Sequence, residues 1–214
     1  MSIGIIGAGA LGSNLARLLA KSGISAMIAN SRGKESLEGL VREFGPSIRA
    51  ASVEEVASAD IVVVAVRWAD LETVLGGLPA WNGRIVVDAT NAVLFLDKNS
   101  PDRNDSNNPL AAYGIKAADL GGKHSSQVFR EFVPGARVVK AFNHIDASIL
   151  SEPVAAGGQR VLFYSGDNPD AKADFRKIIE LTGHFPVDLG PLDVGGPLAS
   201  LPFGTLSTID FVKI

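Results

Sequence analysis

Three glycines near the N-terminus have the spacing of a phosphate-binding turn. Gly7, Gly9 and Gly12 form the pattern G-x-G-x-x-G between the apolar run 3–6 and the amphipathic segment 11–21. This order predicts a strand, a tight turn and a helix, which is the setting that the pattern requires. Gly7 permits the turn, Gly9 lets a pyrophosphate approach the backbone, and Gly12 lets the helix pack closely on the strand. The pattern predicts a dinucleotide site, with a ligand-free glycine turn as the alternative.

The residues after the second predicted strand indicate which dinucleotide would bind. The run 25–29 ends in Asn30, where an NAD-binding fold usually has an acid that bonds the ribose 2′-hydroxyl. Ser31 and Arg32 follow with a hydroxyl and a guanidinium, and Lys34 adds a second cation. A guanidinium can hold a phosphate through two parallel hydrogen bonds. We therefore predict NADP(H), with an ordinary solvated turn as the alternative.

Three more segments follow predicted strands, at 65–68, 88–91 and 141–144. Ligands of a parallel sheet bind beyond the carboxyl ends of its strands, so these segments are expected at the nicotinamide and the substrate. Arg67 is a candidate for binding an anionic substrate, or else a surface charge. Trp68 is a candidate wall for a ring, or else a packing residue.

Amides and histidines supply the remaining candidates. Asn91 and Asn143 can donate hydrogen bonds to a cofactor or substrate, or can fix their own loops. His144 is the acid-base candidate because an unperturbed imidazole exchanges protons near neutral pH, with a structural role as the alternative. His124 and His184 receive no catalytic assignment, and the histidines are too dispersed to predict a metal site.

Composition favours a compact protein that acts on small molecules. The chain has 214 residues, 46% of them hydrophobic, with a formal net charge of −3 and no cysteine. This excludes disulfides and thiolate chemistry, and the absence of basic blocks argues against a nucleic-acid surface. Neither a leader segment nor an apolar run of membrane-spanning length is evident. We expect a cytoplasmic protein with no membrane or nucleic-acid partner.

Strand-like runs alternate with helix-like segments through most of the chain. This alternation predicts a doubly wound α/β fold of the Rossmann type around a parallel sheet. The strand candidates are 2–6, 25–29, 48–50, 61–66, 84–88 and 137–142, and the helical segments lie near 34–44, 53–58, 69–78 and 124–132.

The C-terminal third predicts a smaller unit. We expect a dinucleotide-binding domain over 1–150 and an α/β extension over 151–214 that completes the substrate side, with strands at 160–165 and 185–189 and a helix at 169–182 capped by Asn168. It could extend the sheet or form a small lobe. The polar stretch 97–109 predicts a loop, either a lid or a connector.

At this point the chain resembles the F420-dependent NADP oxidoreductases, whose domain also occurs in the STEAP metalloreductases. The matching segments run in family order and are 5–12, 30–32, 59–68, 138–143 and 187–192. Two differences from archaeal members are Arg67, where a proline is familiar, and the longer, more hydrophilic stretch 97–109. The resemblance implies that NADP(H) is held by Ala8, Gly9, Ala10, Leu11, Ser31, Arg32, Lys34, Ala65, Val66, Arg67, Trp68 and Ala141.

The resemblance further implies hydride transfer between nicotinamide and a second redox cofactor, with coenzyme F420 as the leading candidate. Such a reaction needs positioning and water exclusion more than acid-base groups. Two alternatives remain: an NADPH-dependent reductase of a flavin or of a small carbonyl or imine compound, and a non-catalytic NADPH-binding sensor. A homodimer is expected from the family and from the frequency of such assemblies.

Overall fold

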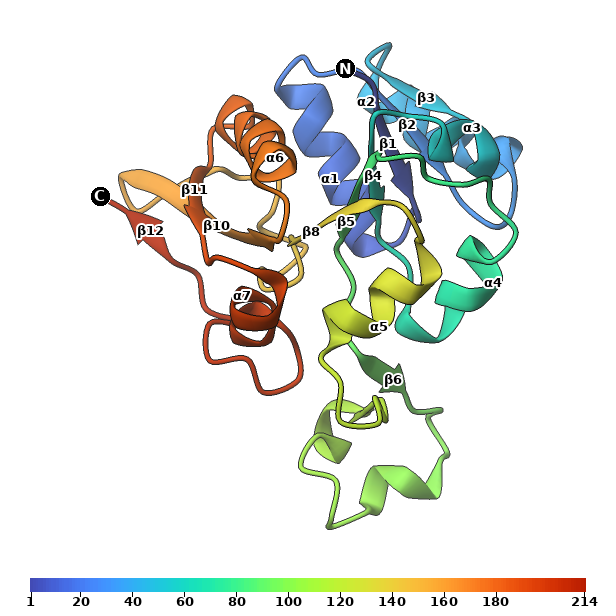
Figure 1. Cartoon of the computed structure of the whole chain (residues 1–214), viewed down its shortest axis with the longest axis vertical. Coiled ribbons are helices and arrows are strands. Elements are labelled where there is room, and N and C mark those ends of the chain that lie inside the picture. The colour runs from blue at the N-terminus through green and yellow to red at the C-terminus, as the bar shows by residue number, and fades with distance from the viewer.

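A single twisted sheet organises the molecule, and the computed structural model describes all 214 residues (Figure 1). Its strand order is β11-β10-β8-β5-β4-β1-β2-β3, so the chain moves outward from β1 in both directions, as in a doubly wound Rossmann fold. The strands of its parallel part are β1 (Ile3–Ile6), β2 (Ala26–Ala29), β3 (Ile48–Ala50), β4 (Ile61–Val64), β5 (Ile85–Asp88) and β8 (Arg137–Ala141).

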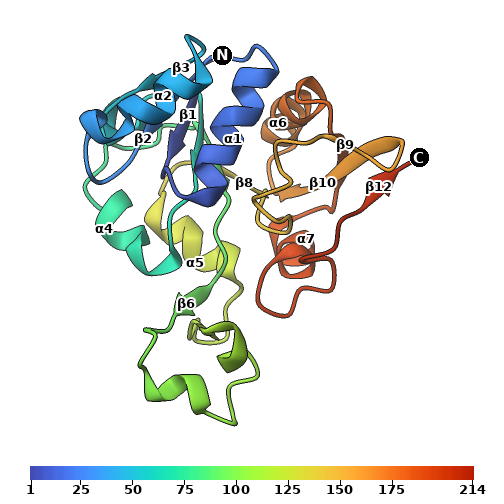
Figure 2. The same ribbon diagram turned by 180° about the vertical axis from the view of Figure 1, so that it is seen from behind.

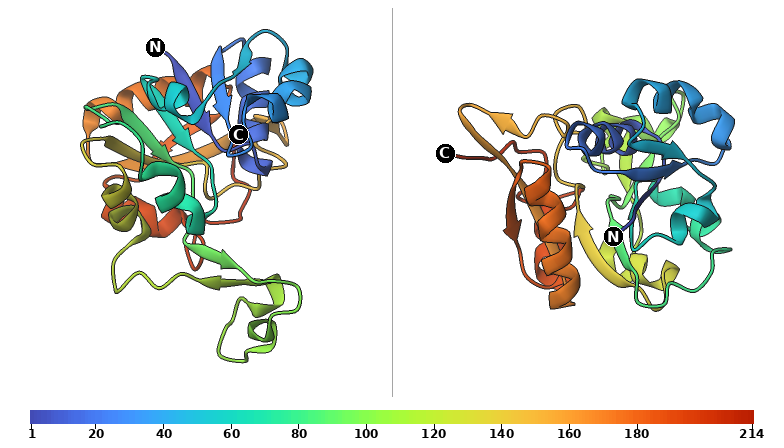
Figure 3. Two further views of the ribbon diagram at one scale, coloured as in Figure 1. Left: turned by 90° about the vertical axis from the view of Figure 1, so that its right-hand side faces the viewer. Right: turned by 90° about the horizontal axis from the view of Figure 1, so that it is seen from above.

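Helices cover both faces of this sheet (Figure 3), and none is long and apolar enough to cross a membrane. In β4, Ile61 and Val63 face one core while Val62 and Val64 face the other, which explains why the run is apolar at every position. The first core includes α1 (Ala10–Lys21) and α6 (Pro169–Leu181), and the second includes α3 (Val53–Ala57), α4 (Leu71–Leu75) and α5 (Ser125–Phe132). Smaller elements are η1 (Lys34–Leu37), α2 (Glu38–Phe44) and η2 (Trp68–Asp70).

The C-terminal third extends the same sheet. Strand β10 (Gly158–Gly166) runs antiparallel to β8, and β11 (Phe185–Asp188) pairs parallel with β10. Short strands β9 (Val154–Ala155) and β12 (Val212–Lys213) complete the edge. The side chain of Asn168 accepts a hydrogen bond from the amide of Ala171 and caps α6, as predicted. The two chain segments therefore share one sheet, although the division at residue 150 remains a prediction.

Helix α7 (Leu192–Ala199) lies in a Gly/Pro-rich stretch and contains Pro197. Two glycines inside it reflect close packing, not turning. A Cβ atom at Gly195 would lie 2.6 Å from side-chain atoms of Leu189 and Ser165, and one at Gly196 would lie 2.8 Å from the hydroxyl of Ser126. Tertiary contact thus outweighs the low helix propensity of this stretch.

The stretch predicted as a loop belongs to an arm that projects from the sheet edge (Figure 2). The arm, residues 93–117, begins with β6 (Val93–Phe95) and ends with β7 (Ile115–Ala117), which pair antiparallel. Two short 3₁₀ helices, η3 (Pro101–Asn104) and η4 (Ala111–Tyr113), lie between these strands. The arm is therefore a hairpin with two short helices between its strands.

Candidate functional site

The glycine turn between β1 and α1 has no room for side chains at two of its three glycines. Gly7 has φ 109°, and a Cβ atom there would overlap the carbonyl oxygen of Ala65. A Cβ atom at Gly12 would overlap the carbonyl oxygen of Gly7. Gly9 differs because no protein atom lies within 4 Å of its Cβ position. The space above Gly9 is open, so a ligand can approach its backbone there.

Helix α1 starts directly behind this opening. Gly9 is its N-cap residue, no side chain caps the helix, and its first turn contains no acid. The first backbone N–H groups and the positive end of the helix dipole are therefore available to an anion. This is the arrangement that binds a pyrophosphate in dinucleotide folds.

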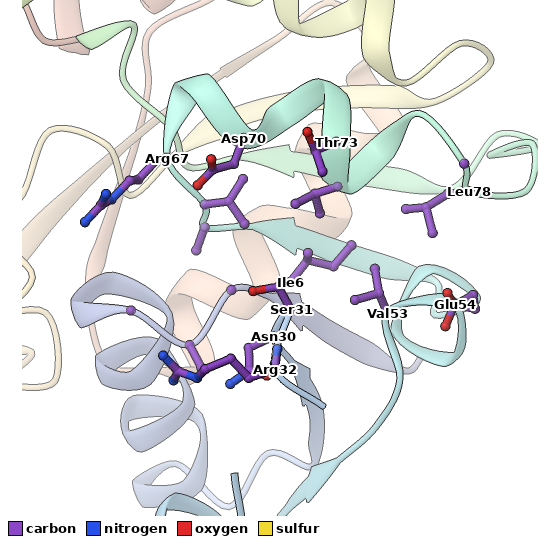
Figure 4. Close-up of a pocket in the computed structure, with 17 residues that line it drawn as sticks. Ile6, Asn30, Ser31, Arg32, Val53, Glu54, Arg67, Asp70, Thr73 and Leu78 are labelled. Atoms are coloured by element: carbon purple, nitrogen blue, oxygen red, sulfur yellow. The ribbon is translucent and has the colours of Figure 1, made fainter. Parts of the chain in front are cut away.

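A cavity of about 760 Å³ lies over the carboxyl ends of β1, β2 and β4 (Figure 4). Ile6, Gly7, Ala8, Gly9, Asn30, Ser31, Arg32, Ala65, Val66 and Arg67 contribute to it from the strand ends. Sequence reasoning missed the rest of the lining. It comes from the start of α3, the end of η2, helix α4 and the residues after α4, and consists of Val53, Glu54, Asp70, Thr73, Val74, Gly77 and Leu78. Their apolar members form a wall of the kind that encloses a base.

Two of the residues predicted to bind the ribose phosphate line the cavity with exposed side chains. Ser31 and Arg32 follow β2, and no carboxylate forms a salt bridge with the Arg32 guanidinium. Asn30 shapes the turn: its Oδ1 accepts from the backbone N–H of Arg32 at 2.9 Å, and its Nδ2 donates to Ser36 Oγ at 2.9 Å. Arg32 thus presents an uncompensated positive charge.

The predicted second cation lies elsewhere. Lys34 does not line the cavity, and its Nζ lies 2.5 Å from a carboxylate oxygen of Glu55. A hydrogen bond from Lys34, followed by one from the Ser52 backbone, lowers the pKa of Glu55 to about 2. Glu55 and Ser52 also form the capping box of α3. The ammonium therefore belongs to a helix cap, which a reading of the sequence around residue 34 alone could not reveal.

Arg67 and Trp68 both follow β4, but their side chains have different surroundings. Arg67 lines the cavity and lies at the end opposite Leu78 (Figure 4). Trp68 is half-buried and packs on the apolar core beneath α4, so the packing alternative describes it.

Asn91 and Asn143 bind each other and a C-terminal loop. Asn91 Nδ2 donates to the carbonyl of Asn143 at 2.8 Å, and Asn91 Oδ1 accepts from the backbone N–H of Leu201 at 2.8 Å. Asn143 Nδ2 donates to the carbonyl of Ala199 at 3.1 Å and to Ser200 Oγ at 3.2 Å. We call these two amides the asparagine clamp. It joins the ends of β5 and β8 to the end of α7, so the loop-fixing alternative describes both residues.

The structure argues against His144 as an acid-base group. Its ring is only 2% exposed and packs on Phe163 at a centroid distance of 4.9 Å. Burial lowers its pKa to about 4, so it is neutral at physiological pH. It follows the end of β8, as the sequence predicted, but its ring is buried against β10.

Sequence reasoning missed a buried ion pair at the same sheet edge. Lys140 Nζ lies 2.7 Å from Asp88 Oδ2, and the two side chains are 1% and 0% exposed. Lys140 also donates to the carbonyl of Thr90 at 3.0 Å, and Asp88 Oδ1 accepts from the hydroxyl and amide of Thr90. A charged residue in each of two neighbouring apolar strands was the available signal. The pair fixes the turn from which the clamp residue Asn91 extends.

Other predicted binding residues contribute no side chain to the cavity. Ala10 is exposed on the first turn of α1, Leu11 packs on the core, and Ala141 is buried in β8. Any role of these residues in binding would go through their backbone.

Comparisons with known proteins place the chain among nucleotide-dependent reductases. The sequence profile of the family described as "NADP oxidoreductase coenzyme F420-dependent" matches residues 2–92. A hypothetical protein from Sinorhizobium meliloti, SMa0349, has a similar solved structure with a TM-score of 0.86 and 38% identity, covering 100% of this chain and 97% of that one. A search of curated proteins finds no match.

Two further solved structures are similar. A proposed F420-dependent NADP reductase from Arthrobacter sp. FB24 has a TM-score of 0.67 and 26% identity, covering 90% of this chain and 86% of that one. A reductive aminase from Aspergillus terreus, in complex with NADPH and ethyl-5-oxohexanoate, has a TM-score of 0.58 and 20% identity, covering 94% of this chain and 57% of that one. The last likeness concerns the fold alone.

Proposed function

Because the chain belongs to the family of coenzyme F420-dependent NADP oxidoreductases, we propose that it transfers a hydride between NADP(H) and a second redox molecule, with F420 as the leading candidate. The observation that carries the choice of dinucleotide is the free guanidinium of Arg32 beside Ser31 at the end of β2. An acid at this place would repel a 2′-phosphate, whereas Arg32 attracts it.

The residues of the chain hold the dinucleotide along the sheet edge. The N-terminus of α1 and the open backbone at Gly9 receive the pyrophosphate. Val53, Val74 and Leu78 enclose the base at one end of the cavity. The bound nicotinamide supplies the hydride, and the contribution of the protein is to fix the geometry and exclude water.

The choice of acceptor rests on the scarcity of proton donors. The acids Glu54 and Asp70 line the cavity, but no histidine, tyrosine or lysine does, and His144 is buried and neutral. At the carboxyl ends of the neighbouring strands β5 and β8, Lys140 is buried and already paired with Asp88. Reduction of a carbonyl or an imine benefits from a positioned proton donor, whereas a deazaflavin or flavin ring accepts a hydride directly. This favours a ring acceptor over a small carbonyl or imine compound.

An acceptor panel tests the proposal. Purified protein is mixed anaerobically with NADPH and, separately, with F420, FMN, FAD or a cyclic imine, and the absorbance of NADPH is followed. We expect oxidation of NADPH with F420 and a much slower reaction, or none, with the imine. Tight NADPH binding without oxidation by any acceptor would support the sensor hypothesis instead.

A further inference from the structure

Arg67 is the one cation of the cavity that the dinucleotide phosphates do not explain. Its side chain is exposed, lines the cavity and lies at the end away from the base-enclosing wall (Figure 4). No carboxylate forms a salt bridge with it, although Asp70 lines the cavity three residues further along. Arg67 therefore has an unused charge and free N–H donors at the end of the cavity opposite that wall.

The ring of Phe95 holds this guanidinium. Cζ of Arg67 lies 5.2 Å from the centre of the Phe95 ring, within the range of a cation–π contact. Phe95 ends β6, the first strand of the arm, and is 62% exposed.

Burial and hydrogen bonds hold the backbone on both sides of Phe95. At the base of the arm, Ala92 and Val93 are buried, and the asparagine clamp fixes the chain at Asn91. Within the arm, the guanidinium of Arg103 donates to the carbonyls of Leu96 and Asp97 at 3.2 and 2.9 Å. These bonds fix the backbone on both sides of Phe95.

The N–H donors of Arg67 are free. No hydrogen bond or salt bridge within the chain uses this guanidinium, whose recorded side-chain contact is the one with Phe95. A guanidinium fork matches a phosphate or carboxylate better than it matches a neutral group. The contact with Phe95 also restricts the side chain in advance, which reduces the entropy that binding would cost.

We propose that Arg67, held in place by Phe95, binds the anionic group of the acceptor. The substrate class is then a planar redox ring that carries a phosphate or a carboxylate, and the arm contributes to the choice of acceptor. This inference rests on the proposed function, since it assumes that the acceptor lies next to the bound nicotinamide.

FMN and riboflavin provide a matched pair of probes because they share one ring system and differ by a phosphate. Binding of each flavin to the protein saturated with NADP⁺ is measured by the quenching of flavin fluorescence. We expect the wild-type protein to bind FMN more tightly than riboflavin, roughly ten-fold or more for one charge-assisted contact. R67Q should remove this preference, and F95L should reduce it.

R42Q is the control, because Arg42 is an exposed arginine of α2 with neither a salt-bridge partner nor a place in the cavity. Its preference should equal that of the wild type. The inference is overturned if R67Q keeps the wild-type ratio, or if neither flavin binds. NADPH affinity is measured in parallel: a loss confined to NADPH in R67Q would place Arg67 at the pyrophosphate. Failure of the wild-type protein to bind NADPH would instead refute the proposed function.

Discussion

Replacing Arg32 by alanine should weaken NADPH binding selectively. The guanidinium is exposed, and it has no ion-pair partner that would compete with a ligand phosphate. A hydrogen bond to a charged group contributes roughly 1.5–3 kcal/mol, and solvent screening at an exposed site reduces this to about 1–2 kcal/mol. The dissociation constant of NADPH should therefore rise roughly 5- to 30-fold.

Titration calorimetry with NADPH and with NADH separates this effect from a general loss of binding. NADH lacks the 2′-phosphate, so R32A should leave its affinity nearly unchanged. K34A is the comparison variant, because Lys34 is paired with Glu55 at 2.5 Å. It should change the ratio of the NADPH and NADH affinities much less than R32A does. Equal weakening of both dinucleotides by R32A, or a larger effect of K34A than of R32A, would refute the assignment of the phosphate to Arg32.

Three further predictions concern the turn, the buried ion pair and the histidines. G9A should abolish NADPH binding but leave the melting temperature of the free protein nearly unchanged, because no protein atom lies where the added methyl group would be. G12A should instead lower the melting temperature, since the added Cβ atom would overlap the carbonyl oxygen of Gly7. K140M leaves a buried carboxylate unpaired and should lower the free energy of unfolding by about 3–5 kcal/mol in urea titrations, an effect absent if the pair contributes little. Burial lowers the pKa of His144 and His184 to about 4, so the unfolded chain binds protons before the folded one does. The free energy of unfolding should therefore fall as the pH drops from 6.5 toward 4. In urea titrations across this range, the free energy of unfolding should depend less on pH after both histidines are replaced by leucine.

Periodicity and glycine spacing predicted the parallel core because local patterns determine it. The short, β-branched apolar run of β4 indicates a strand that is buried on both faces, and the three glycines fit one strand–turn–helix geometry. Asn168 likewise caps α6 with its own side chain, which is a contact of three residues along the chain.

Long-range contacts decided the features that the sequence did not predict. Lys34 and Glu55 are far apart in the chain, so their pairing was invisible from the turn that contains Lys34. Helix α7 forms because Gly195 permits close packing on β10, a cause that no local propensity includes. His144 follows a strand end as predicted, but its ring faces Phe163 of the antiparallel strand β10, whose direction the sequence left open.

Transfer of deuterium from NADPH labelled at C4 of the nicotinamide tests the central claim most directly. The protein is mixed anaerobically with the labelled NADPH and F420, and the reduced acceptor is analysed by mass spectrometry. The account predicts deuterium in the reduced deazaflavin, in step with the loss of NADPH absorbance. Bound NADPH that transfers no deuterium to F420 and is not oxidised by FMN or FAD would contradict it.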